Sequence, residues 1–368
     1  MIDRWGKNAV AIVAAASLGL MLSGCELGKK KVEQTGYRGT GGDQVTAVAR
    51  LTSQPVPQPP YPLPAAGGPT AGQTYQNVKV LTNVSAERFN YIMASISQWV
   101  APQDGPDPTK VGCNYCHNPA NMASDEKYTK VVARRMLQMT LAINSKWQGH
   151  VQNVGVTCYT CHRGNAVPKY VWSAADPGHP AHGLLGDKQG QNAPSPAVSY
   201  ASLPNDPFST FLTTDKNIRV QNTNASGLYE KPGPSLKEAE KTYGLMMHMS
   251  SALNVNCTFC HNTDSFSSWS NSRPQRVTAW YGIRMVRDID QTYIASLQHV
   301  FPDNMNRKGP LGDVYKANCA TCHQGLNKPL GGVSMLGDYP DLRGPTPAGA
   351  PAPAAAPAAG AGGTKTAK

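Results

Sequence analysis

The sequence predicts a mainly α-helical fold with little sheet and long irregular connections. Four segments carry helical patterns, at residues 85–100, 124–147, 235–253 and 276–299, and no segment shows the sustained alternation typical of a strand. Aromatic residues make up only 7% of the 368 residues and charged residues 15%, whereas Gly and Pro number 35 and 30. With so few large side chains, the interior is expected to be filled by something besides the polypeptide.

The ends of two of these helices have capping signals. Ser85 and Ser235 are predicted N-caps, and Arg88 and Glu238 follow them by three residues, so only Ser235 completes a capping box. The stretch at 165–230 is rich in Pro, Asn, Ser and Gly and is therefore predicted to be a long connection.

The N-terminus has the pattern of an export signal. Arg4 and Lys7 precede an apolar run at 9–22, and Leu-Ser-Gly directly precedes Cys25. This ending resembles a bacterial lipobox, which predicts removal of residues 1–24 and lipidation of Cys25. The alternative is a retained helix, because the apolar stretch is almost long enough to span a bilayer. Both interpretations place the folded part on the periplasmic face of the inner membrane.

Both ends of the chain differ in composition from its middle. Residues 25–74 are rich in Gly and Pro and are predicted to form an extended, polyproline-like N-terminal segment that links the anchor to the body or crosses a partner. Residues 344–368 consist mostly of Pro, Ala and Gly without apolar periodicity and are predicted to be a disordered tail.

The nine cysteines carry the most specific signal. Cys25 stands alone, and the other eight form four CxxCH motifs. Two thiols separated by two residues can bond both vinyl groups of one porphyrin, and the following His then lies under the iron as its proximal ligand. A zinc interpretation requires paired knuckles with conventional spacing, and a disulfide interpretation leaves four consecutive His unexplained. We therefore predict four covalently attached haem c groups, at Cys113-Cys116-His117, Cys158-Cys161-His162, Cys257-Cys260-His261 and Cys319-Cys322-His323.

The four motifs belong to an internal repeat. Each half of the chain has the order helix, CxxCH, helix, CxxCH, and residues 158–164 match residues 319–325. The predicted halves are 75–225, with haems 1 and 2 and the long connection, and 226–343, with haems 3 and 4.

Bound haem would also change the net charge of the protein. The formal net charge is +11, and omitting residues 1–24 and 344–368 removes four of the 34 basic residues and one of the 23 acids, which leaves +8. Two propionates on each haem would largely offset this excess. No basic stripe with interleaved aromatic residues is present, so the sequence excludes nucleic-acid binding.

The second axial ligand decides whether each iron only carries electrons. An iron capped by His/Met or His/His is saturated, whereas an open iron binds substrate. A single Met on a helix is more often a packing residue, but Met recurs in the helix before each of the first three motifs. These residues are Met93, then Met136 and Met139, then Met246, Met247 and Met249 together with His248.

The fourth motif has no Met close upstream, and the residues alone leave its second ligand open. Internal symmetry favours Met285 or His299. The other candidates are Met305, His150, His179, His182 and His248.

At this level of detail the chain resembles the tetrahaem cytochrome subunit of purple-bacterial photosynthetic reaction centres. The resemblance covers about residues 75–343. It is carried by long ungapped stretches at 75–81, 131–137, 155–164, 256–262 and 282–288. Residues 104–110 depart from the family pattern as an insertion ahead of Cys113.

The resemblance implies two helical halves related by a pseudo-twofold axis and four haems in a row. Met93, Met136 and Met246 would be the second ligands of haems 1, 2 and 3, and His150 would reach haem 4, in place of the ligands that symmetry favours. The implied order from the bacteriochlorophyll special pair is haem 3, 4, 2, 1. Arg276 would lie near haem 3 at the membrane-facing interface.

The resemblance also implies an electron-transfer subunit and not an enzyme. It would accept electrons from a soluble periplasmic cytochrome or high-potential iron–sulfur protein and re-reduce the photo-oxidised special pair in the reaction-centre core. The alternatives are a multihaem periplasmic reductase, which would need an open iron, and a quinol-chain electron-transfer lipoprotein. Acids outnumber Lys110 and Lys127 near the first motif, which favours a cationic carrier; they are Asp104, Asp107, Asp125 and Glu126.

Overall fold

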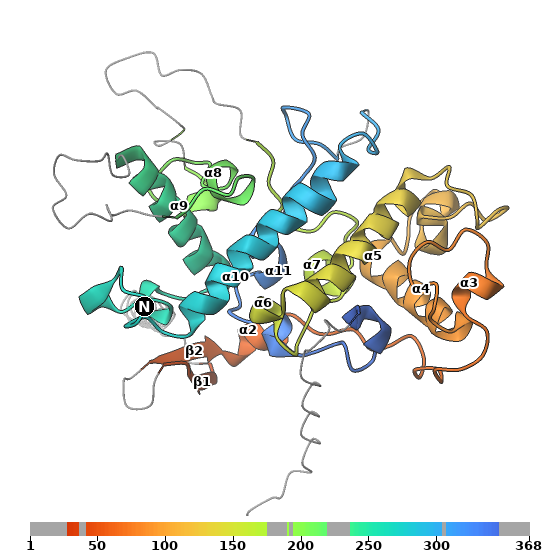
Figure 1. Cartoon of the computed structure of the whole chain (residues 1–368), viewed down its shortest axis with the longest axis horizontal. Helices are drawn as coiled ribbons and strands as arrows, with labels where there is room; N and C mark the ends of the chain where they lie inside the picture. Colours follow the sequence, from red (N-terminus) through yellow and green to blue (C-terminus); the bar gives the residue numbers. More distant parts are fainter. Residues whose placement is uncertain are drawn as a thin grey trace, which may run out of the picture. The chain divides into compact units, whose positions relative to one another are not determined.

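The computed structural model describes residues 28–36, 42–174, 190, 194–218, 236–303 and 307–345. The chain forms two compact units, Met1–Pro55 and Val56–Lys368. In the described residues the fold is mostly helical with a single two-stranded sheet, as predicted (Figure 1). No helix in this part of the chain has the length and apolar character needed to cross a membrane.

The first unit contains the sheet, which the sequence did not predict. Strands β1 (Lys30–Gln34) and β2 (Asp43–Ala47) pair antiparallel with Val32 opposite Val45, and helix α2 (Val48–Thr52) follows directly. This part of the expected extended segment is therefore a hairpin. Its strands have too few apolar residues for alternation to be visible, and the pairing rests on the backbone. Residues 56–69 of the second unit carry no helix or strand.

The second unit begins with the helices that surround the first two motifs. They are α3 (Ala71–Thr74), α4 (Ala86–Val100), α5 (Tyr128–Lys146), α6 (Gln148–Val151) and α7 (Cys158–His162), with 3-10 turns η1 (Pro108–Lys110) and η2 (Gly112–Tyr115). Ser85 caps α4 as predicted, because its Oγ accepts a hydrogen bond from the backbone N–H of Arg88 at 3.4 Å. Helix α5 begins later than the predicted residue 124, since residues 121–127 form no helix.

The rest of the second unit repeats this order. Its elements are η4 (Pro196–Val198), α8 (Ser209–Leu212), α9 (Leu236–Leu253), η5 (Cys257–Phe259), η6 (Thr263–Ser265), α10 (Gln275–Asp288), the π-helical turn η7 (Ile289–Ile294), η8 (Ala295–Leu297), α11 (Cys319–His323), η9 (Pro329–Gly332) and η10 (Pro340–Arg343). The predicted cap Ser235 lies outside the described residues. Figure 1 shows α5 alongside α10, and the Trp147 indole N–H links them by donating to Asp288 at 2.9 Å.

The C-terminal segment packs back onto the first helices of the second unit. Tyr339 is buried between α4 side chains, with its ring stacked on Tyr91 at 5.0 Å and edge-on to Trp99 at 4.6 Å. Ser95 donates a hydrogen bond to the Tyr339 hydroxyl at 3.0 Å. Aromatic pairs at these separations add to the apolar area that they bury. The segment around Tyr339 therefore helps to fix the wall behind the second motif.

Asn144 ties α5 to two other segments. Its amide N–H groups donate to the carbonyls of Val156 at 2.9 Å and Leu342 at 2.7 Å, and its oxygen accepts from the Val156 N–H at 2.7 Å. The residue is buried, so no water can replace these partners.

We expect Asn144→Ala to lower the free energy of unfolding by roughly 2 kcal/mol or more, because it leaves buried backbone groups without partners. Denaturant unfolding of the full chain measures this. Gln138→Ala is the matched control, since Gln138 is an exposed residue of the same helix that bonds Arg135, and its effect should stay within about 0.5 kcal/mol. Equal effects of the two substitutions would contradict the assignment.

Candidate haem centres

The second and fourth CxxCH motifs form matching helical turns that contact each other. In α7 the Thr160 hydroxyl accepts a hydrogen bond from the Thr157 backbone N–H at 3.0 Å, and in α11 the Thr321 hydroxyl accepts one from the Asn318 backbone N–H at 2.9 Å. Each turn ends in a left-handed residue, Arg163 or Gln324.

The side chains after the two histidines cross between the motifs. Arg163 donates from its guanidinium to the carbonyl of Cys322 at 3.3 Å, and Gln324 donates from its amide to the carbonyl of Cys161 at 3.4 Å. The two contacts are reciprocal, because each joins the residue after one motif's His to the second Cys of the other motif. The second and fourth motifs therefore lie side by side.

The first and third motifs have a different local structure. Cys113 and Cys257 lie in the 3-10 turns η2 and η5, and the backbone N–H of the following His bonds back to the first Cys, at 3.0 Å for His117 and 2.9 Å for His261. These turns are more exposed than α7 and α11.

All four motif histidines are held in the same way. The Nδ1 atom of each lies within hydrogen-bond distance of a backbone carbonyl: Met122 for His117 (3.0 Å), Asn165 for His162 (2.8 Å), Phe266 for His261 (3.0 Å) and Leu326 for His323 (2.9 Å). A carbonyl only accepts, so Nδ1 carries the proton and Nε2 presents its lone pair. This is the arrangement that metal-ligating histidines require.

The environment keeps these rings neutral. Burial lowers the pKa of His117, His162, His261 and His323, and the last falls to about 4 with a further contribution from His150. A neutral imidazole is the form that binds a metal ion.

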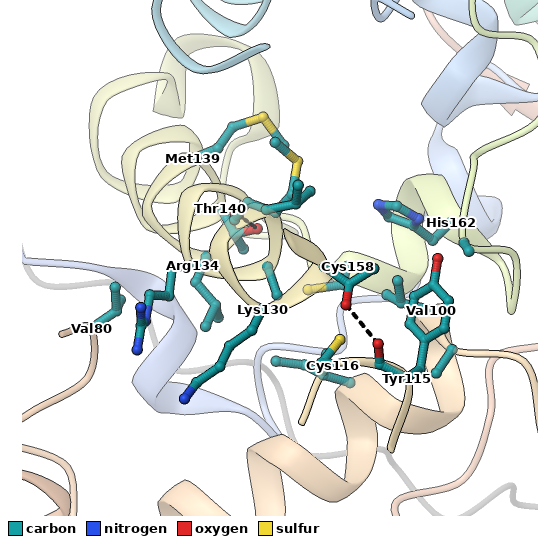
Figure 2. Close-up of a pocket in the computed structure, with 18 of the residues that line it drawn as sticks. Val80, Val100, Tyr115, Cys116, Lys130, Arg134, Met139, Thr140, Cys158 and His162 are labelled. Atoms are coloured by element: carbon teal, nitrogen blue, oxygen red, sulfur yellow. Dashed lines mark hydrogen bonds between the residues drawn. The ribbon is translucent and has the colours of Figure 1, made fainter. Parts of the chain in front are cut away.

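The first two motifs line one cavity of about 800 Å³ (Figure 2). Cys116, Cys158 and His162 lie around it in Figure 2, and Met93 and Met136 also belong to its wall. The size lies at the upper end of the range for cofactor sites, and the lining is mostly apolar. Two cysteine pairs, two imidazoles and two thioethers in one apolar cavity fit haem c bound through the first and second motifs.

His150 lies against the fourth motif. Its Nδ1 donates to the Thr278 carbonyl at 2.9 Å, and its ring centre is 5.9 Å from that of His323. Two imidazoles on opposite faces of one metal have ring centres roughly 6 Å apart, because each metal–nitrogen bond is about 2 Å. Gly282 permits this approach, since a Cβ there would lie 2.6 Å from the His150 ring. The donor pair therefore also fits a haem iron.

The other described candidates for the fourth site have different neighbours, although His248 bonds the side chain of Asn318, the residue before Cys319. Met285 packs with Ile143 and Ile289 in an apolar cluster, and His299 is exposed. His248 is buried edge-on against Phe208, at 4.6 Å between ring centres. Three further candidates lie outside the described residues, namely His179, His182 and Met305, as does Cys25.

Of the two remaining predicted residues, the structure places Arg276 beside the third motif and Met246 in an apolar cluster. Met246 packs against a cluster that includes Phe208 and Leu245. Arg276 lies 4.2 Å above the Trp269 ring and donates to the Ser268 carbonyl at 2.8 Å, so it braces the loop that follows His261.

A disulfide joins Cys161 to Cys322 in this structure, and the other six motif cysteines are free. The bond links two different motifs, whereas a CxxC redox dithiol closes within one motif. A cysteine sulfur forms either a disulfide or a thioether, so this bond and haem attachment are alternative states of the two residues.

Asp290 is a buried acid that the sequence did not mark. It lies on the π-helical turn η7 and is 2% exposed; Oδ1 accepts the Ala317 N–H at 2.8 Å, and Oδ2 is buried without a hydrogen-bond partner. Ala317 stands two residues before Cys319, so Asp290 positions the entry to the fourth motif. Burial raises the pKa of Asp290 well above 3.8, against the opposing charge of Lys316.

This raised pKa predicts the sign of one pH effect. The native state keeps the Asp290 proton to a higher pH than the unfolded chain does, so the stability that this proton contributes is present below about pH 3.8 and is lost as pH rises through the raised pKa. In Asp290→Asn the free energy of unfolding should fall less over that range, measured by denaturant unfolding at several pH values. Asp264→Asn, on an exposed turn, is the control, and parallel curves for wild type and Asp290→Asn would refute the assignment.

A mostly helical fold, four CxxCH motifs and four motif histidines held by backbone carbonyls define the class of this protein as a c-type cytochrome. The family model for the photosynthetic reaction centre cytochrome c subunit matches residues 26–343, and the chain belongs to this family.

Curated relatives agree with this membership. The photosynthetic reaction center cytochrome c subunit of Rubrivivax gelatinosus is 50% identical over 344 residues, which cover 93% of this chain and 90% of the relative. The subunits of Thermochromatium tepidum (49% over 335 residues; 90% and 79% covered) and Roseobacter denitrificans (37% over 325 residues; 84% and 84%) carry the same name. The predicted resemblance is confirmed, and with it the assignment to haem-dependent photosynthetic electron transport.

Proposed function

We propose that the chain holds four covalent haem c groups on the periplasmic face of the photosynthetic membrane and re-reduces the photo-oxidised special pair of the reaction-centre core. The observation that carries the proposal is the common state of the four motif histidines. Each has Nδ1 bound to a carbonyl and Nε2 available, at every one of the four motifs.

The proposed axial pairs are His117 with Met93, His162 with Met136, His261 with Met246 and His323 with His150. Met93 and Met136 are supported by their place in the wall of the cavity that also holds the first two motifs. His150 is supported by its separation from His323. In this state the cysteines of each motif form thioethers, including Cys161 and Cys322.

The proposed order of the sites, third, fourth, second and first from the special pair, has support in the contact between α7 and α11. This contact makes the second and fourth motifs neighbours, as the order requires. The reciprocal Arg163 and Gln324 contacts are also those expected for two dihaem halves, 75–225 and 226–343, related by a pseudo-twofold axis.

When bound, haem supplies a one-electron iron couple, and the protein sets its potential. A thioether ligand stabilises the reduced iron relative to imidazole, so the His150–His323 site should have a lower potential than a His/Met site in similar surroundings. Saturated ligation excludes substrate from the metal, which disfavours a reductase.

Attachment and electron entry complete the proposal. Lipidation of Cys25 would tether the chain, and contacts with the core subunits, with Arg276 at that interface, would share the anchoring, because one acyl chain binds membranes only marginally. A soluble cytochrome or iron–sulfur carrier would dock near the first motif. Electrostatic steering there is weaker than the sequence predicts, since Asp125 pairs with Lys130 and Arg134, and Asp107 pairs with Lys110.

The direct test is flash spectroscopy on membranes that hold the full chain with its reaction centre. After chemical reduction of the haems, a flash should be followed by loss of haem c α-band absorption as the special pair is re-reduced. Four spectrally intact haems that stay reduced after the flash would refute the donor role. Readily bound carbon monoxide at one iron would favour the reductase.

His150→Met tests the fourth site. One of four midpoint potentials should rise, because a thioether replaces an imidazole. Potentiometric titration measures it, and His299→Met is the matched control at an exposed histidine that internal symmetry also favours. No movement in His150→Met, or an equal rise in both variants, would show that His150 is not a ligand.

A further inference from the structure

Lys130 is a buried cation beside the first motif. It lies in the first turns of α5, on the wall of the cavity in Figure 2, and is 8% exposed. A lysine ammonium is rarely buried unless its charge and donors are satisfied. Here Nζ donates to the carbonyls of Met122 and Ser124, each at 2.8 Å, and pairs with an Asp125 oxygen at 3.3 Å.

One of these acceptors also holds the first motif histidine. The Met122 carbonyl takes the His117 Nδ1–H at 3.0 Å and the Lys130 ammonium at 2.8 Å. A carbonyl oxygen has two lone pairs, so it can serve both donors at once. Lys130 and His117 are thus coupled through a single oxygen atom.

This sharing changes what His117 can give to a metal. The acceptor at Nδ1 sets how strongly the imidazole donates through Nε2, because a stronger acceptor gives the ring more imidazolate character. A cation on the same oxygen draws electron density away and weakens it as an acceptor. The ring then donates less to the iron, which disfavours the oxidised state.

The third motif has only a weaker counterpart. Arg276 reaches the Phe266 carbonyl, the acceptor for His261, at 3.5 Å, and its shorter bonds go to the Ser268 carbonyl at 2.8 Å and the Ser272 hydroxyl at 2.6 Å. The arrangement at the first motif is therefore the more direct one.

Lys130 is also poorly suited to pair with a haem propionate. An ammonium has three donors, and Met122, Ser124 and Asp125 account for three contacts. Arg134 bonds the other oxygen of Asp125 at 2.8 Å, so Asp125 holds both cations.

We propose that Lys130 is a positioning residue for the first haem, acting through the Met122 carbonyl on His117 to raise the reduction potential of that site. The inference rests on the proposed function, because it takes His117 as the proximal ligand. Lys130 would influence the reduction potential without contact to the iron or the porphyrin.

The test is redox titration of the full-length holoprotein carrying Lys130→Met, which keeps the stem and removes the charge. The first-haem midpoint should fall by an amount equivalent to a tenfold shift toward the oxidised form, 59 mV for one electron, while the other three stay unchanged. A separate Met93→His variant identifies the first-haem wave. Lys130→Gln should also lower the midpoint, since it can donate to Met122 without charge, and it serves if Lys130→Met does not mature.

Lys127→Met is the matched control. Lys127 is also cationic and near His117, but its ammonium bonds the carbonyls of Thr109 and Asn114 and not that of Met122. The first-haem midpoint should shift clearly less in Lys127→Met than in Lys130→Met. Equal shifts in Lys130→Met and Lys127→Met would mean that the charge alone matters and would overturn the inference. No midpoint shift in Lys130→Met or Lys130→Gln, with four intact haems, would overturn it as well. A wild-type protein without four haems would instead refute the proposed function.

Discussion

The arrangement of this protein depends on hydrogen bonds from histidine Nδ1 atoms to backbone carbonyls. A CxxCH motif supplies two thiols and an imidazole, but the imidazole is a useful ligand only when its ring is fixed and its Nε2 carries no proton. The loop after each motif provides the acceptor, from Asn165 in the second and Leu326 in the fourth, three residues beyond each His. Burial of the rings lowers the pKa of each histidine, which keeps them neutral. The motif and the loop that follows it are therefore one functional unit.

The contact between α7 and α11 makes the two halves of the sequence interdependent. Arg163 and Gln324 each bond the carbonyl of a cysteine in the other motif, so neither turn is complete alone. His150, reached from the first half, lies beside His323 of the second half. In the proposed function this junction is the central link of the electron path, where rigid spacing matters most.

Much of the fold and site could be predicted from the sequence, and the exceptions have physical causes. Helix α4 and its Ser85 cap follow from local signals, and the family follows from motifs. The position of His150 could not follow from internal symmetry, because it depends on Gly282 of α10, far along the chain, leaving room for the ring. Asp290 gave no signal, since its burial arises from tertiary contacts with the segment before α11. The β1–β2 hairpin was missed because it rests on backbone pairing more than on apolar side chains.

In the proposed function, four identical motifs need not give four identical potentials, because the local structure around the motifs differs. The first and third motifs lie in partly exposed 3-10 turns with acceptors five residues beyond the His, whereas the second and fourth lie in α-turns with acceptors three residues beyond. A longer loop leaves its carbonyl accessible to a neighbouring cation, as Lys130 reaches Met122. At the second and fourth motifs, where the loops are short, the nearest polar neighbour is instead the side chain that crosses from the other motif, Arg163 or Gln324. Because CxxCH itself is constant, the potential of each site must be tuned by these surroundings.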